Sequence, residues 1–232
     1  DREPAKLITQ PQFDMTIHRS SNHEQRATHI SSDGDNHFVS VWTVGPTQRV
    51  MARLINETKP VGPEFVVGEA FLDGSQPAVT MDHSGDFVVV WNGRQEPNST
   101  TTVIRMRKFS ATGEPLTDER VVTSAVGDLL SAPNVAIAGE TGEFVVTWTR
   151  RANASSESGT VQYQHFNEAG VAENSHQNLQ ASVYIRPAIA MRPTGEFVIS
   201  GARFVPSAQL TQVFAQHFDA DGTTQGDAIN IG

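Results

Sequence analysis

Acidic residues recur in short glycine-bearing turns, and carboxylates in such loops can bind calcium or transfer protons. The segments "SDGDNH", "DHSGD", "ETGE" and "PTGE" contain Asp33, Asp35, Asp82, Asp86, Glu140, Glu143 and Glu196. Asp side chains also stabilise turns by accepting hydrogen bonds from nearby backbone N–H groups. We expect this structural role for most of the set.

One further turn, "DADG", places Asp219 and Asp221 just before Gly222. Calcium takes about six to eight oxygen ligands, and an Asp-x-Asp-Gly loop supplies some of them. Thr223 and Thr224 follow the glycine, where a full calcium loop would need more acidic ligands. The sequence therefore predicts at most a weak calcium site at Asp219 and Asp221, and no other cofactor.

A basic side chain recurs near one position of the chain's repeated segments. His165 and His217 each precede a phenylalanine, and Arg53 and Lys108 are placed at the same position in two other segments. Such a stripe could bind an anionic glycan or an acidic partner, although a solvated polar position explains it equally. The predicted binding residues are Arg53, Lys108, His165, His217, Tyr184 and Arg186.

Catalysis by a carboxylate pair is a third hypothesis, because glycosidases use two such groups on either side of the bond they cleave. Glu24, Asp73 and Asp128 precede three of the repeated segments, and the fourth has "VYIRP", which contains Tyr184 and Arg186. Sialidase boxes, Gly-x-Ser-x-Gly, His-Glu-x-x-His and phosphate loops are absent from the sequence. We therefore predict no catalytic residue and no enzyme, with a glycosidase or sialidase as the minor alternative.

The elements that position these residues are repeated four times. Phe38, Phe87, Phe144 and Phe197 follow the acidic turns at separations of 49, 57 and 53 residues. Each segment contains a strand before the turn, a strand such as "FVVVW" after it, a third strand and a short fourth one. Glycine-centred turns between β-branched runs are typical of hairpins.

The "FVVVW" strand is apolar on both faces, since Phe87, Val89 and Trp91 alternate with Val88 and Val90. A strand with one wet face would alternate apolar and polar residues. Both faces must therefore be covered, as happens when small sheets stack on their neighbours in a propeller. Alanines such as Ala188 and Ala190 in a first strand would suit a crowded central axis.

The predicted fold class is all-β, a propeller-like array of four four-stranded antiparallel repeats, with stacked β-sandwiches as the alternative. We expect one domain, 1–232, with repeats at approximately 28–70, 77–125, 133–180 and 187–232. Residues 5–10 are predicted to add a further edge strand of the fourth-strand type. Exposed edges of the terminal repeats would allow self-association.

Composition restricts the partners. The chain has 232 residues, a net charge of −9 and no cysteine. The charge argues against nucleic acid and anionic membranes, and the lack of cysteine excludes disulfides and thiolate metal sites. No apolar run approaches the ~18 residues of a membrane span, and no signal peptide is present in this sequence.

The segments "PAVTMDHSGDFVVVW", "VIRMRKFSATGEPL" and "ERVVTS" resemble a ~50-residue repeat of large secreted or surface proteins of bacteria. The match covers nearly the whole chain from about Thr28 and weakens in the fourth repeat, where Gly201 replaces the tryptophan. The resemblance implies an extracellular or cell-surface setting and defines no active-site residue.

These observations together predict a non-catalytic binding or spacer module that contacts a protein or a glycan at a bacterial cell surface through its loops, as an adhesion protein does. A lectin-like module with one weak glycan site per repeat is the first alternative. The glycosidase is the second.

Overall fold

The computed structural model describes residues 25–231 except residues 46–47, 73, 157–158 and 206–209, and side chains of 180–186 and 203–210 are also left undescribed. The predicted extra edge strand at 5–10 lies outside these residues. The described residues contain no helix. None of them therefore forms an apolar helix long enough to cross a membrane.

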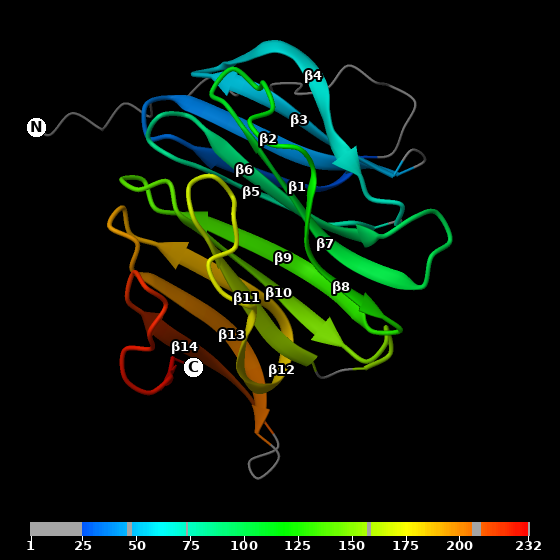
Figure 1. Cartoon of the computed structure of the whole chain (residues 1–232), viewed down its shortest axis with the longest axis vertical. Helices are drawn as coiled ribbons and strands as arrows, with labels where there is room; N and C mark the ends of the chain where they lie inside the picture. Colours follow the sequence, from blue (N-terminus) through cyan, green and yellow to red (C-terminus); the bar gives the residue numbers. More distant parts are fainter. Residues whose placement is uncertain (1–24, 46–47, 73, 157–158, 206–209, 232) are drawn as a thin grey trace, which may run out of the picture.

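Four antiparallel four-stranded units follow one another along the chain, so the predicted all-β, propeller-like class is confirmed (Figure 1). The first sheet contains β1 (Gln25–Ser32), β2 (His37–Val44), β3 (Arg49–Asn56) and β4 (Lys59–Glu69). The second sheet contains β5 (Pro77–Met81), β6 (Phe87–Arg94), β7 (Thr101–Phe109) and β8 (Arg120–Val126). Within each, the strands pair in chain order.

The third and fourth units share one strand and form a single seven-stranded hydrogen-bonded sheet. Its strands are β9 (Leu129–Ile137), β10 (Phe144–Arg151), β11 (Gly159–Phe166), β12 (Gln177–Met191), β13 (Phe197–Val205), β14 (Leu210–Phe218) and β15 (Ile229–Asn230). The first half of β12 pairs with β11 and the second half with β13. We call β9–β11 with the start of β12 the third sheet, and the end of β12 with β13–β15 the fourth.

The continuous β12 differs from the two separate strands expected there. Gly74 and Gly127, at the two earlier junctions between units, adopt φ values of 77° and 80°, a region open mainly to glycine. The segment from Gln177 to Met191 contains no glycine. The chain therefore stays extended where the other two junctions turn.

Both faces of the second strand of each inner sheet are buried, as the apolar pattern predicts. Phe87, Val88, Val89, Val90 and Trp91 are fully buried. The side with Phe87 and Trp91 packs on the first sheet, and the side with Val88 and Val90 packs on the third. Each inner sheet is thus held between two neighbours.

The same pattern forms three successive inter-sheet cores. The side chains of Val39 and Val41 face the second sheet, and Val145 faces the fourth. Trp91 and Trp148 are fully buried in two of these cores, and Trp42, on the side of the first sheet opposite Val39 and Val41, is 3% exposed. Stacking of whole sheets, rather than one central core, therefore holds the fold together.

The first strands of the first two sheets are joined by side chains. The backbone N–H of Val79 donates to His29 Nδ1 at 3.3 Å, and the N–H of Met81 donates to Ser31 Oγ at 3.1 Å. These bonds satisfy N–H groups on the edge of β5 that no strand covers. They fix where β1 lies against β5.

Acid should weaken this junction. Burial lowers the pKa of His29, so the unfolded chain binds more protons than the folded chain below the ordinary histidine pKa of about 6.5. The free energy of unfolding should therefore fall as the pH drops below about 6.5 toward the folded-state pKa, and should be unaffected by His29 above that range.

Urea unfolding at pH 7.5 and pH 5.5 tests this, with His29→Asn as the comparison, since Asn accepts a hydrogen bond and does not titrate. The variant should lose less stability than the wild type between the two pH values. Equal losses in the two proteins would show that His29 does not contribute.

The innermost strand of the fourth sheet does not border a crowded axis, contrary to expectation. Ala188 and Ala190 are exposed, whereas Ala78, at the position of Ala188 in the second sheet, is buried. The difference arises because a third sheet covers Ala78, while no described sheet covers the corresponding side of the fourth.

Candidate functional site

The turn between β1 and β2 holds a carboxylate–histidine pair. Asp33 Oδ1 accepts hydrogen bonds from the N–H groups of Asp35 at 2.7 Å and His37 at 3.3 Å. Asp33 Oδ2 lies 2.6 Å from His37 Nδ1. The turn thus aims a buried carboxylate at an imidazole four residues later.

The pair has the form of an oriented acid–base group. The side chain of Asp33 is 5% exposed and that of His37 is 55% exposed. Burial opposes ionisation of Asp33, but the hydrogen bonds from Asp35 and His37 outweigh it and hold the pKa of Asp33 below its ordinary value. An ionised carboxylate at Nδ1 leaves Nε2 of His37 as the atom that meets a ligand.

The equivalent turn of the second sheet holds a buried Asp82. Its Oδ1 accepts from the Ser84 N–H at 2.9 Å, the Ser84 hydroxyl at 2.6 Å and the Asp86 N–H at 3.1 Å. Within the described part of the chain, Oδ2 of Asp82 has no hydrogen-bond partner. Oδ2 is therefore the oxygen that can act on a ligand.

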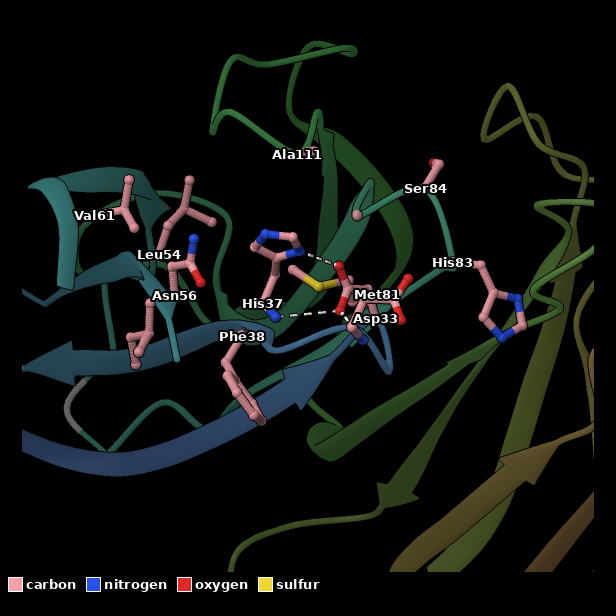
Figure 2. A pocket seen from close by; sticks show the side chains of 13 residues that line it. Asp33, His37, Phe38, Leu54, Asn56, Val61, Met81, His83, Ser84 and Ala111 are labelled. Carbon is pink, nitrogen blue, oxygen red and sulfur yellow. Dashed lines mark hydrogen bonds and ion pairs between the residues drawn. The ribbon is translucent and has the colours of Figure 1, made fainter. Parts of the chain in front are cut away.

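A cavity of about 360 Å³, here called the junction cavity, opens between the first two sheets. Figure 2 shows the His37 ring standing inside it, between Leu54 and Val61 on one side and Ala111 on the other. Apolar side chains form much of the wall, and Asp33, Asp35, His37 and Asn56 supply polar groups. Such a mixture of apolar walls with a few polar groups is typical of ligand sites.

A second cavity of about 280 Å³, the axial cavity, lies where turns of all four units converge. Its lining residues are Ser32, Asp33, Gly34, Met81, Asp82, His83, Ile137, Gly139, Met191 and Pro193. Asp33, Met81 and His83 line both cavities, so the two adjoin. His37 lines the junction cavity, and Asp82 lines the axial cavity from the same turn as His83.

His83 connects the turns of the second and third sheets. In Figure 2 its ring points away from His37, toward the later repeats. A methyl group added to Gly139 would overlap the His83 imidazole, so the ring lies directly on the glycine backbone. The lack of a side chain at Gly139 thus keeps this wall of the axial cavity in place.

The predicted basic stripe is not uniform, because the strand register puts Leu54 rather than Arg53 opposite Val39. Lys108 faces Val88 and His165 faces Val145, at the matching position. Arg53 is one residue away from the matching position, so its side chain points to the other face of its sheet. There it donates a hydrogen bond to the carbonyl of Gly62 at 3.0 Å. Aligning the repeats by the anchor residue of the third strand placed Arg53 one residue wrongly, because β3 has Ile55 where the other units have phenylalanine.

Two of the remaining stripe residues are structural contacts between sheets. Lys108 is 7% exposed and its Nζ donates to the Glu168 carbonyl at 3.2 Å. His165 is 8% exposed and its ring stacks on Phe197 of the fourth sheet with 6.4 Å between ring centroids, while its Nδ1 lies 2.5 Å from Glu173 Oε2 within the third unit. His217, at the same position of the fourth sheet, is exposed. No cavity described above contains any of the three.

The carboxylates expected before each first strand do not form a described site. Glu24 and Asp73 lie outside the described residues, as do the side chains of Tyr184 and Arg186 in β12. Asp128 is described, and its Oδ2 lies 2.7 Å from Arg150 Nε. It sits beside the loops that follow the second strands, away from both cavities.

The "DADG" turn uses its carboxylates internally. The Thr223 N–H donates to Asp219 Oδ1 and to Asp221 Oδ1, each at 2.8 Å. Hydrogen bonds from Thr223 are the main reason that the pKa of Asp221 is lowered. Within the described ranges, no group of three or more His, Asp or Glu side chains is placed to hold a metal ion, and the weak calcium site remains a prediction.

A partly exposed carboxyl, that of Glu119, lies between the first two sheets, and its side chain is 36% exposed. Burial raises the pKa of Glu119, although Arg105 and Arg107 oppose the shift. Glu119 Oε1 lies 2.8 Å from Arg105 Nε. Arg105 also donates to the carbonyls of Arg94 and Gln95. This cluster holds strand ends together and borders neither cavity.

The comparisons with known proteins come from structure alone. No family model matches the chain, and no curated protein matches it. An endo-arabinase from Bacteroides thetaiotaomicron VPI-5482 is similar with a TM-score of 0.50 and 12% identity, over 89% of this chain and 81% of that one. An α-L-arabinofuranosidase from Lactobacillus brevis gives a TM-score of 0.47 and 9% identity, over 88% and 73%.

A Hadza microbial sialidase, Hz136, is similar with a TM-score of 0.49 and 12% identity, over 81% of this chain and 47% of that one. At these identities the likeness concerns the fold. The likeness to the endo-arabinase supports the propeller-like arrangement of the sheets in this chain.

The prediction of a non-catalytic binding or spacer module, and with it the prediction of no enzyme, is contradicted by this comparison, because the structure that is similar at a TM-score of 0.50 is an endo-arabinase. The physical reason is that a missing signature excludes only the families that carry it. Carboxylates on turns can perform the same chemistry at other spacings.

The sequence analysis named Asp33 and Asp82 among the turn carboxylates but did not join them with His37. The signal was present as an Asp and a His four residues apart in "DGDNH", and as the second tip "DHSGD". What the sequence does not contain is the convergence of these two turns on adjoining cavities.

Proposed function

We propose that this protein is a glycosidase-type hydrolase that acts on a glycan at the joined junction and axial cavities. The observation that supports it best is the solvent-reachable His37, held by buried Asp33, in a cavity that adjoins the one lined by Asp82. The likeness of the fold to an endo-arabinase supports a glycan as the substrate class.

Hydrolysis of a glycosidic bond needs one group that gives a proton to the leaving oxygen and a carboxylate that acts on the other side of the sugar. In our proposal, protonated His37 donates from Nε2 to the leaving oxygen as the bond from carbon to oxygen breaks. Asp82 Oδ2 accepts a proton from the water that adds to the anomeric carbon. Asp33 stays ionised and positions the imidazole.

Asp33 itself is a positioning residue. Both of its oxygens are occupied by the turn and by His37. Its lowered pKa keeps the carboxylate charged as the pH falls. An ionised neighbour stabilises the protonated imidazole that the reaction requires.

Release of reducing ends from a panel of polysaccharides tests the proposal. The panel should include arabinan and sialylated glycans, which the names of the similar structures point to. We expect cleavage of at least one member and no signal from the double variant His37→Gln, Asp82→Asn. A folded wild-type protein that cleaves none would contradict the proposal.

We also propose an extracellular bacterial setting, which the resemblance to secreted ~50-residue repeats supports. A glycan outside the cell would be accessible there without transport. Immunodetection of the protein in the medium and on intact cells would test this setting independently of activity.

A further inference from the structure

The fourth sheet has one face that no described sheet covers, here called the free face. Strand register puts Ala188, Ala190, Val198, Ala202, Val213 and Ile229 on this face. The opposite side of the same sheet, with Phe197, Ile199 and Phe214, packs on the third sheet. Alternation along each strand therefore leaves a whole second side without a partner.

The free face occupies the position of an interface in the other sheets. Val88 and Val90 on β6 are fully buried against the third sheet, and Val145 on β10 is fully buried against the fourth. Their counterparts on β13, Val198 and Ser200, are only half-buried. Val213 is 41% exposed and Ile229 is 61% exposed.

The chemistry of this face favours a sheet over a polar ligand. Its positions are aliphatic or small, with His217 as the one ionisable side chain among those described. Small side chains permit two sheets to approach to about 10 Å. Apart from His217, the described side chains of this face carry no aromatic or charged group, so they offer little to a sugar or a nucleic acid.

The three existing interfaces define what such a sheet must present. In each interface, the side of a sheet's second strand that carries Val88 and Val90, or the equivalent residues, packs on the aromatic side of the second strand in the following sheet. Between the second and third sheets, that aromatic side carries Phe144, Val146 and Trp148. Polar contacts accompany it, since Lys108 donates to the carbonyl of Glu168 in the next sheet. His217 stands at the Lys108 position, free to make the corresponding contact.

The first sheet does not supply this partner. Its aromatic side carries Trp42, which is 3% exposed and therefore already covered. In Figure 1 the first sheet lies at the top of the molecule and the fourth at the bottom.

We propose that the free face is a docking surface for a further four-stranded repeat of the same type, from outside this chain, that presents a Phe-x-Val-x-Trp strand. This inference is independent of the proposed hydrolase activity. It follows from the continuity of three interfaces that repeat the same pattern.

An extended protein tests it, in which the full chain is followed by a copy of residues 70–126. Urea unfolding should shift to a higher midpoint. The m value should rise by about a quarter, because m scales with the surface exposed on unfolding and five repeats replace four. A copy of residues 127–180 in place of 70–126 serves as a second extension. If neither extension raises the midpoint, the proposal is overturned.

Ala190→Asp distinguishes docking on the free face from mere tethering. Ala190 is exposed in the four-repeat chain, so this variant should hardly change its midpoint, whereas it should lower the midpoint of the extended protein. Equal shifts in both proteins would contradict docking there.

The mass of the unextended chain by light scattering provides the alternative outcome. We expect a monomer at micromolar concentration. A dimer that Ala190→Asp dissociates would mean that a second copy covers the face, and would overturn the proposed occupant.

Discussion

Replacing His37 with Gln, or Asp82 with Asn, is expected to lower the rate of glycan cleavage by about 10²–10⁴-fold, the usual contribution of a positioned acid or base. His37 Nε2 is the proton donor of the proposed reaction, and Gln cannot replace it because its side chain has no ionisable proton to transfer. Asn at position 82 still accepts the turn hydrogen bonds of Ser84 and Asp86. The second change therefore removes the charge with little effect on the turn.

Matched controls exist in the fourth repeat. Asp219→Asn alters a turn aspartate whose Oδ1 accepts the Thr223 N–H, outside both cavities. His217→Gln alters an exposed histidine outside them. Initial rates of reducing-end release should match the wild type in both controls. A loss in the controls as large as in the site variants would assign the effect to folding rather than chemistry.

Asp33→Asn separates positioning from proton transfer. It keeps an acceptor for the turn but removes the negative charge beside His37 Nδ1. The rate should fall while substrate binding, measured as KM, changes little, because Asp33 acts through His37. An unchanged rate would mean that the pair is only a turn element.

Replacing Trp91 with Ala should lower the free energy of unfolding by about 3–5 kcal/mol, the range for a large aromatic core residue. Trp91 is fully buried, and its Nε1 donates to the Glu69 carbonyl of the first sheet at 3.1 Å. Gly68 lies against the same indole, since a Cβ there would come within 2.5 Å of Trp91 Cζ2. The side chain therefore joins two sheets.

Urea denaturation followed by circular dichroism measures this effect. Val126→Ala is the control, because Val126 is 80% exposed and surface changes of this kind stay within about 0.5 kcal/mol. A loss below 1 kcal/mol for Trp91→Ala would show that the inter-sheet core does not carry the stability assigned to it.

The repeat architecture could be predicted because its signal is local. Apolar residues on both sides of "FVVVW" require two covering layers, and the structure supplies them around Val88 and Trp91. The glycine turns fixed the hairpins in the same way. By contrast, the continuous β12 depends on the lack of a glycine between Gln177 and Met191, a weaker signal.

The site could not be predicted because its parts come from different repeats. Asp33 and His37 are four residues apart, but the cavity around them also needs β3 and the turn that contains Gly85. The position of Arg53 was predicted wrongly because the four repeats were aligned by their anchor residues, and in the first repeat Ile55 replaces the phenylalanine. Register, and not residue type, decides which side chains meet.

A crystal of the Asp82→Asn variant soaked with an oligosaccharide that the wild type cleaves would show where the glycan binds. We expect sugar density in the joined cavities, with the glycosidic oxygen within hydrogen-bond reach of His37 Nε2. Density at another surface, such as the region of Asp128 and Arg150, with empty cavities would contradict this expectation.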